Sequence, residues 1–165
     1  MKLIFVRHGE PLKDDYGIAK MGKEEMKLLA KYFDDNYSID IIYSASSRRA
    51  TESVMVLNEL IHKDVNFCEW LNEFKYRIPI VSEKGEFPWE LPPEYWINDD
   101  QMLDYKDVLN TKLLVNSEVV YKAEMVWKEL DKIIEENGYE RVGNLYKVNK
   151  PNKKEIVLVT HFATM

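Results

Sequence analysis

Two of the three histidines in this chain stand directly after apolar runs that are typical of strands. His8 follows the run at residues 2–6 and its neighbour Arg7, and His161 follows the run at residues 155–160. In an open α/β sheet, ligands bind at the carboxyl ends of the strands. If the two strands are parallel neighbours, both imidazoles reach one crevice. A neutral imidazole, whose unperturbed pKa is about 6.5, can act as a nucleophile at neutral pH.

Three arginines stand beside the same predicted strand ends. Arg7 precedes His8, and Arg48 and Arg49 follow the strand predicted at residues 40–44, where a helix begins. The first turn of a helix favours an anion, because its backbone N–H groups and its dipole point outward. An arginine placed there can hold two phosphate oxygens at once. Taken alone, an arginine pair is typical of a solvated face, but together with the histidines it indicates a phosphoryl-binding pocket.

A carboxyl group would complete such a site, because it can protonate a leaving oxygen and then take a proton from water. The candidates are Glu10, Glu52, Glu69 and Glu73. The segment "FCEWLNE" is predicted as a strand followed by a loop, which would bring Glu73 to the rim of the crevice. Taken singly, each of these glutamates is typical of a solvated surface carboxylate.

The elements that must position these residues are predicted from hydrophobic periodicity. Three short apolar runs indicate strands that are buried on both faces, as in a parallel sheet. They cover residues 2–6, 40–44 and 155–160. Apolar stripes predict helices over residues 23–35, from Ser46 or Ser47 onward, and over residues 117–137. The order strand, helix, strand indicates an α/β fold with right-handed connections.

Two segments depart from this alternation. Residues 77–116 are rich in proline, aromatic and acidic residues and are predicted to be an insertion, partly irregular and partly helical. Long loops of this kind are usually functional, although a packed surface flap is the plainer interpretation. Residues 139–154 contain turn residues and predict a hairpin or an edge strand. Because no repeat or linker is apparent, residues 1–165 are predicted to form a single domain.

The composition limits the partners. The formal net charge is −6 and the sequence pI is about 5.2, which argues against nucleic acid or an anionic membrane as the main partner. A small anionic substrate is still compatible, since a local pocket can be cationic. The single cysteine, Cys68, fits a reducing compartment. With no signal segment or bilayer-spanning run, a cytoplasmic location is expected, and a homo-oligomer is left open.

Four blocks of the sequence together resemble the histidine phosphatase superfamily. They read "VRHGE", "YSASSRRATES", "LNE" and "VTHFATM", in the order and approximate spacing of that family over essentially the whole chain. "RHG" alone is a weak signal, whereas four blocks in register are specific. The resemblance implies a phosphoglycerate mutase-like, three-layer α/β/α fold with a mainly parallel central sheet. It also implies a site without a metal or a cofactor.

The resemblance assigns a role to the matching residues. His8 would be the nucleophile that forms a phosphohistidine, and Arg7 and Arg49 would hold the phosphoryl oxygens. His161 would join them and stabilise charge during transfer. Glu73 would be the general acid and then the general base.

The remaining residues of these blocks have less specific interpretations. Gly9 would allow close approach of the backbone to phosphate, or a positive φ. Glu10 would orient a neighbouring group or cap the loop. Gly9 and Glu10 are both predicted to belong to the substrate-binding residues. Arg48 is expected to be an exposed helix residue. Phe162 stands where relatives carry a small residue, so it would narrow the pocket, stack on a substrate or pack in the core.

The implied activity is hydrolysis of a phosphate monoester, with a small phosphorylated metabolite as the favoured substrate and a phosphoprotein as the alternative. The mutase branch continues its catalytic glutamate with an Arg-His-Tyr-Gly type of run, and "EFKYRIP" in this chain favours a phosphatase instead. The alternatives are a mutase, a non-catalytic phosphate-binding module, and a metal site made of His8, Glu10 and His161. Arginines beside such a metal would disfavour it. Because relatives continue beyond the position of Met165, we expect a truncated C-terminus.

Overall fold

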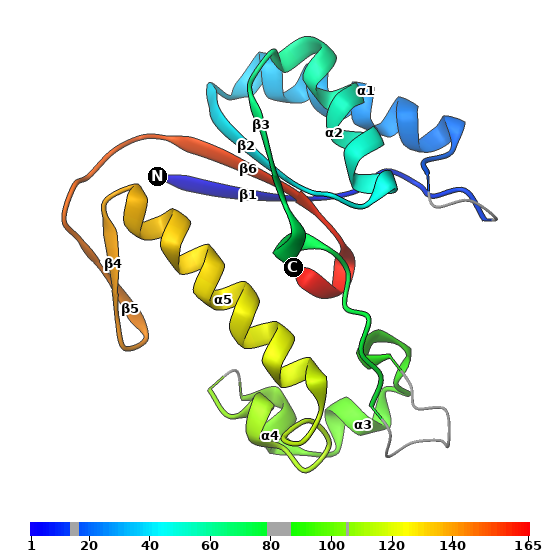
Figure 1. Cartoon of the computed structure of the whole chain (residues 1–165), viewed down its shortest axis with the longest axis vertical. Helices are drawn as coiled ribbons and strands as arrows, with labels where there is room; N and C mark the ends of the chain where they lie inside the picture. The colour runs from blue at the N-terminus through cyan, green and yellow to red at the C-terminus, as the bar shows by residue number, and fades with distance from the viewer. Residues whose placement is uncertain (14–16, 79–86, 105) are drawn as a thin grey trace. The chain divides into compact units, whose positions relative to one another are not determined.

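The computed structural model describes residues 1–13, 17–78, 87–104 and 106–165. The chain divides into two compact units, one made of Met1–Glu73 with Glu129–Met165 and the other of Phe74–Lys128. All the predicted site residues belong to the first unit, which also holds the parallel sheet (Figure 1). The predicted insertion at 77–116 falls in the second unit, and its residues 79–86 and 105 lie outside the described residues.

Four parallel strands form the sheet of the first unit, in the order β1–β6–β2–β3. They are β1 (Lys2–Arg7), β2 (Ile39–Ala45), β3 (Val65–Cys68) and β6 (Glu155–Thr160). The last strand lies between the first two, so β1 and β6 are parallel neighbours. Arg7 pairs with Thr160 and Ser44 pairs with Val159. The residues that follow these strands therefore emerge together at the carboxyl end of the sheet.

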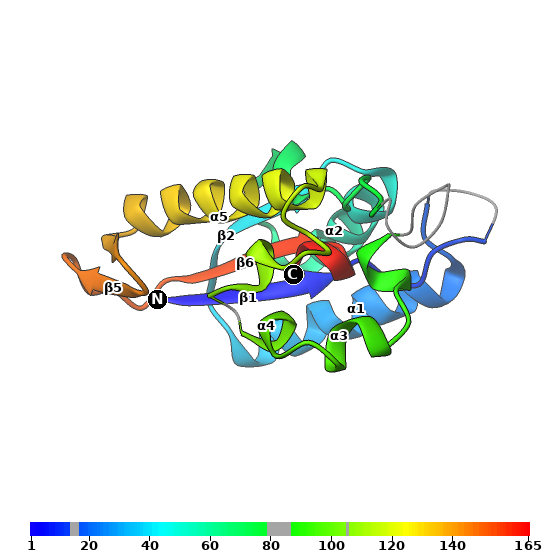
Figure 2. The same cartoon turned by 90° about the horizontal axis from the view of Figure 1, so that it is seen from below.

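Helices cover both faces of this sheet. Helix α1 (Lys20–Asn36) and helix α2 (Arg48–Ile61) lie on one face, and residues 129–136 of α5 (Glu118–Glu136) lie on the other (Figure 2). This arrangement confirms the three-layer α/β/α fold with a mainly parallel sheet. Helix α1 begins earlier than its predicted start at residue 23, so Gly22 falls in its first turn. Glycine is a poor helix former, and its packing described below explains its presence there.

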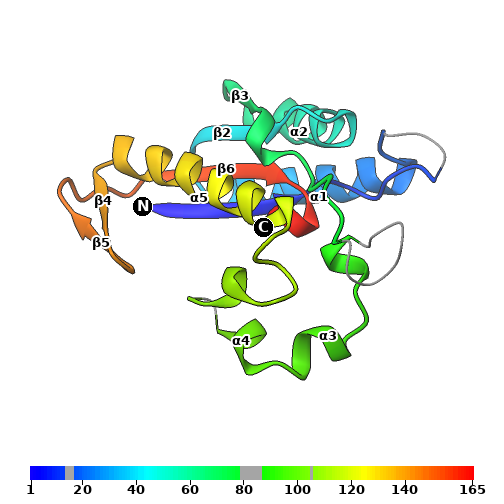
Figure 3. The same cartoon turned by 60° about the horizontal axis from the view of Figure 1, so that its bottom comes forward.

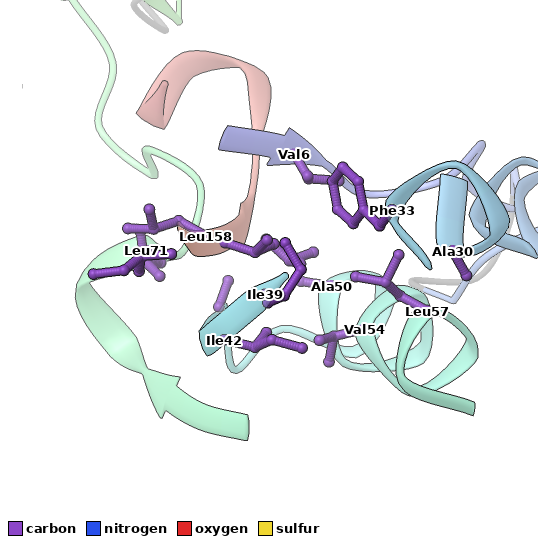
Figure 4. Close-up of a cluster of buried hydrophobic side chains, with 14 of the residues drawn as sticks. Val6, Ala30, Phe33, Ile39, Ile42, Ala50, Val54, Leu57, Leu71 and Leu158 are labelled. Carbon is purple, nitrogen blue, oxygen red and sulfur yellow. The ribbon is translucent and has the colours of Figure 1, made fainter. Parts of the chain in front are cut away.

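Buried apolar side chains fill the space between the sheet and its helices (Figure 4). They include Phe33 of α1, Val54 and Leu57 of α2, and Ile42 and Leu158 of the sheet, none more than 3% exposed. Burying a side chain of this size stabilises a fold by roughly 1.5–3 kcal/mol. The packed layers therefore hold the strand ends in a fixed relation to the start of α2.

A separate antiparallel hairpin precedes β6 at the end of the sheet where the chain begins (Figure 3). Its strands are β4 (Tyr139–Val142) and β5 (Leu145–Val148). Of the two predictions for this segment, the hairpin is confirmed. The N-terminal ammonium of Met1 donates to the Tyr139 hydroxyl at 3.0 Å. The carboxylate of Asp131 in α5 accepts hydrogen bonds from Arg141 and Tyr146 of the hairpin.

Residues 118–128 of α5 belong to the second unit, and the rest of its described part consists of short helical pieces joined by turns. They are α3 (Glu94–Ile97), α4 (Asp100–Leu103) and single 3₁₀ turns at Pro88–Glu90 and Val108–Asn110. An open pocket of about 270 Å³ lies among α3, α4 and Lys112, and none of its lining residues belongs to the predicted site. Across the described residues of both units, no helix is long and apolar enough to cross a membrane.

Candidate active site

The register of β1 against β6 places the two predicted histidines side by side. Since Arg7 is opposite Thr160, the next residues, His8 and His161, emerge together. The N–H of His8 donates to the carbonyl of Thr160 at 3.0 Å, which extends the strand pairing. The ring centroids lie 5.0 Å apart, with the planes inclined at 60°. His8 is 6% exposed and His161 is fully buried, so both imidazoles are largely removed from water.

One hydrogen bond decides which nitrogen of His8 carries its proton. Nδ1 lies 2.8 Å from the carbonyl oxygen of Gly9. A carbonyl can only accept, so Nδ1 is protonated and Nε2 keeps its lone pair while the ring is neutral. Burial is the main cause that lowers the pKa of His8, and the bond to Gly9 opposes it. Arg49 and Arg7 lower this pKa further, while Glu10 raises it. His8 is therefore neutral at neutral pH, with a nucleophilic Nε2.

Arg49, in the first turn of α2, joins the other two predicted catalytic residues. Its Nε donates to Nδ1 of His161 at 3.3 Å, and its Nη2 lies 3.7 Å from Oε2 of Glu73. The same carboxylate oxygen lies 3.7 Å from Nδ1 of His161. Oε1 of Glu73 accepts the N–H of Ala163 at 3.1 Å. The structure thus brings Arg49, Glu73 and His161 together, as the sequence blocks imply.

Ser47 holds the other side of the His161 ring. Its Oγ lies 2.8 Å from Nε2 of His161. Because arginine has no acceptor, Nδ1 of His161 must be the acceptor of the Arg49 bond. The proton of the neutral ring is then on Nε2 and is donated to Ser47. Both ring nitrogens of His161 therefore have partners within the protein.

Gly9 packs closely against the first turn of α1. A Cβ on Gly9 would lie 2.5 Å from the carbonyl oxygen of Gly22, so a glycine is required by contact rather than by a positive φ. The N–H of Gly9 donates to Oγ of Ser53 at 3.0 Å, and that hydroxyl donates to the carbonyl of Arg49 at 2.6 Å. Ser53 therefore links the loop after β1 to the turn that carries Arg49.

Arg7 and Glu10 are both exposed, unlike the histidines. The guanidinium of Arg7 is 5.9 Å from the ring centroid of Phe162, which is 62% exposed and so is not a core side chain. Glu10 is held through its main chain. Its N–H donates to Oε2 of Glu25 at 2.8 Å, and its carbonyl accepts the N–H of Ala19 at 2.8 Å. The side chain of Glu10 itself is exposed.

The other charged candidates have different partners. Arg48, with a side chain 59% exposed, donates to Glu52 at 2.8 Å, as expected for a surface helix residue. Glu52 also accepts the N–H of Ile18 at 2.8 Å and so ties the loop before α1 to α2. Glu69 accepts hydrogen bonds from Ser46 and Asn72. Glu73 is the carboxylate that contacts both Arg49 and His161.

Sequence reasoning missed three polar residues that support this site. Ser47 was one of two predicted helix caps, and Asn72 and Ser53 were present only as members of the blocks "LNE" and "YSASSRRATES". Asn72 Oδ1 accepts the N–H of Ser47 at 2.9 Å, across 25 positions, and the bond between Ser47 and His161 spans 114 positions. The spacing of residues along the sequence cannot predict such contacts, because they depend on the order of the strands in the sheet.

A metal-binding cluster was the other possible grouping of these side chains. Within the part of the chain that the structure describes, no three His, Cys, Asp or Glu residues are arranged so as to hold a metal ion. His8, Glu10 and His161 accordingly do not form such a group. The Nδ1 atoms of both histidines are instead engaged with Gly9 and Arg49.

Comparison with known proteins agrees with this fold. Residues 3–84 match the histidine phosphatase superfamily (branch 1). No curated protein sequence matches the chain. The chain belongs to the histidine phosphatase superfamily.

Several solved structures share the fold at low sequence identity. The protein histidine phosphatase SixA, complexed with tungstate, is 10% identical with a TM-score of 0.55, over 99% of this chain and 71% of that one. Phosphoserine phosphatase from Entamoeba histolytica is 19% identical with a TM-score of 0.56, over 98% and 74% of the two chains. A mycobacterial glucosyl-3-phosphoglycerate phosphatase is 14% identical with a TM-score of 0.59, over the same shares.

Proposed function

We propose that this protein is a phosphatase that hydrolyses a phosphate monoester through a phosphohistidine on His8. The observation that carries the proposal is the state of His8, which is buried, neutral and bonded through Nδ1 to the carbonyl of Gly9. That bond leaves the Nε2 lone pair for attack on phosphorus. The family membership and the phosphatases among the structures of similar fold support the same reaction class.

In the first half-reaction, Nε2 of His8 attacks phosphorus, and the bond from phosphorus to the leaving oxygen breaks as the P–N bond forms. The leaving oxygen takes the proton of the Glu73 carboxyl group. The bond from Nδ1–H to Gly9 stabilises the positive charge that develops on the ring. Arg49 and Arg7 hold the equatorial oxygens, where cations stabilise the transition state.

In the second half-reaction, water attacks the phosphorus of the phosphohistidine. Glu73, now a carboxylate, takes a proton from the water, the P–N bond breaks, and inorganic phosphate leaves with His8 neutral again. The hydrogen bond from Ala163 to Oε1 keeps the carboxyl group in place while it serves as acid and then as base. Protein cations supply the charge stabilisation in this scheme, so we propose that no metal is needed. The substrate class is a small phosphorylated metabolite.

The test compares the whole chain with a His8→Asn variant on a chromogenic aryl phosphate in the presence of a chelator. We expect the substitution to reduce kcat by at least about 10³-fold, as for other removed nucleophiles. His62→Asn is the matched control, because His62 lies at the end of α2 with a φ of 54°, which asparagine tolerates. Isotopically labelled substrate should leave an acid-labile phosphoryl group on the wild type and on His62→Asn, but not on His8→Asn.

Four other outcomes would contradict part of the proposed function. Equal activity in the wild type and the His8 variant would overturn the mechanism. Transfer of the phosphoryl group to an added alcohol without net release of phosphate would indicate a mutase. Binding of inorganic phosphate without turnover or labelling would indicate a non-catalytic module, and activity that the chelator abolishes would contradict metal independence.

A further inference from the structure

Ser47 stands at the N-cap of α2 but does not cap it. A serine at this position usually accepts a hydrogen bond from a backbone N–H of the first helical turn. The Ser47 side chain makes no such bond and lies 2.8 Å from Nε2 of His161 instead. The hydroxyl is therefore committed to a buried histidine that comes from the far end of the sequence.

We infer that Ser47 is a positioning residue that acts through His161 on the guanidinium of Arg49. The inference rests on the proposed function, in which Arg49 holds the phosphoryl oxygens. The bonds run in one direction: Arg49 Nε–H donates to Nδ1 of His161, and Nε2–H of the same ring donates to Ser47 Oγ. Arg49 decides which nitrogen is protonated, and Ser47 fixes the rotation of the ring.

This chain of bonds determines what Arg49 can present to a ligand. With Nε bonded to His161, the end of the guanidinium that bears Nη2 faces Glu73, at 3.7 Å. A ring turned about its axis would bring an N–H or a carbon towards Arg49 Nε–H, and the bond would be lost. Because His161 is fully buried, water cannot replace Ser47 as the acceptor without a rearrangement.

The backbone of Ser47 is also held by a hydrogen bond. Its backbone N–H donates to Oδ1 of Asn72 at 2.9 Å, in the loop that carries Glu73. The neighbouring Ser46 differs, since its hydroxyl bonds to Glu69 at 2.5 Å and accepts from Asn72 at 2.8 Å. Of these two adjacent serines, only Ser47 bonds through its hydroxyl to His161, so Ser46 serves as a control that lacks this contact.

The experiment compares Ser47→Ala, Ser47→Gly and Ser47→Thr with the control Ser46→Ala in the whole chain. Glycine is a good N-cap without a hydroxyl, so it separates helix capping from the bond to His161, and threonine should restore that bond. Nitrogen-15 NMR of His161 should report protonated Nε2 in the wild type, in S47T and in S46A. In S47A and S47G we expect a mixture of tautomers or a shifted ring signal.

The second measurement is affinity for inorganic phosphate together with kcat/KM on an aryl phosphate. Loss of one hydrogen bond in the support of Arg49 should reduce both about 3- to 10-fold in S47A and S47G, with less than about a twofold change in S46A. An unchanged His161 signal in S47A, or equal losses in S46A and S47A, would overturn the inference. If the wild type shows no turnover, the proposed function fails, while the NMR signal and phosphate binding still decide the role of Ser47.

Discussion

Gly9 and Gly22 lie back to back, and each occupies the space that a side chain on the other would need. A Cβ on Gly9 would lie 2.5 Å from the carbonyl oxygen of Gly22, and a Cβ on Gly22 would lie 2.5 Å from the carbonyl oxygen of Glu10. The loop that bonds His8 is thus in direct backbone contact with the first turn of α1. This contact explains a glycine inside a helix, where it costs about 1 kcal/mol relative to alanine.

Gly9→Ala should therefore disturb both folding and the site. The new methyl group meets backbone atoms, which cannot move aside cheaply, so we expect the free energy of unfolding to fall by roughly 1–3 kcal/mol. Hydrolysis should fall as well, because the carbonyl of Gly9 holds Nδ1 of His8. Urea unfolding and kinetics measure the two effects. Gly143→Asn is the control, since Gly143 has a φ of 61° and open space around its Cβ. If Gly9→Ala unfolds at the same urea concentration as the wild type, the close contact between Gly9 and Gly22 is contradicted.

Arg48 and Arg49 should respond very differently to substitution by lysine. Arg49 bonds to His161 and lies beside Glu73, whereas the side chain of Arg48 is 59% exposed and paired with Glu52. Lysine keeps the charge but not the planar fork. We expect Arg49→Lys to lower kcat/KM by about 10²-fold and Arg48→Lys by less than about threefold. Steady-state kinetics on one aryl phosphate checks the ratio, and similar losses in both would contradict the assignment of Arg49.

The lowered pKa of His8 makes the stability of the fold depend on pH. Between the folded-state pKa and the usual value of 6.5, the unfolded chain binds a proton that the folded chain does not. The free energy of unfolding should then be fully retained above 6.5 and fall as the pH drops through the folded-state pKa. Urea unfolding at about pH 7 and about pH 5 should show a larger loss for the wild type than for His8→Asn. Parallel losses in the two chains would mean that His8 is not the group responsible.

The same neutral form of His8 governs the proposed chemistry. Attack on phosphorus needs the Nε2 lone pair, so the loss of kcat/KM on the acidic side should begin below the ordinary value of 6.5. A plot of kcat/KM against pH measures this acidic limb. An acidic limb above 6.5 would require a raised pKa for His8 and would contradict its burial beside Arg49 and Arg7.

Tyr146 should be the last tyrosine to ionise near the hairpin. Burial and the hydrogen bond to Asp131 raise the pKa of Tyr146 to about 12. Its contribution to stability is complete below the unfolded value of 10.0 and is lost as the pH rises through about 12. Tyr146→Phe should reduce the free energy of unfolding by about 1 kcal/mol, because Asp131 loses a donor.

An ultraviolet titration of the phenols measures this pKa. The step near 12 should vanish in Tyr146→Phe and persist in Tyr121→Phe, where the ring is 65% exposed. If the late step is present in both variants, another tyrosine is responsible for it.

Much of the fold followed from local patterns in the sequence. The apolar runs marked β1, β2 and β6, and the stripes marked α1, α2 and α5, because burial imposes a period on each element before any partner is known. Gly138 marked the end of α5 and adopts a φ of 91°. The start of α1 was placed too late, since Gly22 argues against a helix unless its contact with Gly9 is known.

The sequence by itself determined which residues stand at strand ends and which family blocks they form. His8, Arg49, Glu73 and His161 could be named because their types and order carry the chemistry. Only the tertiary structure decided which nitrogen of each histidine holds its proton, that Glu73 meets Arg49, and that Ser47 bonds to His161. The physical reason is that hydrogen bonds and tautomers depend on distances of a few tenths of an ångström between distant segments. Those distances arise from the pairing of β6 with β1 and β2, which no local pattern encodes.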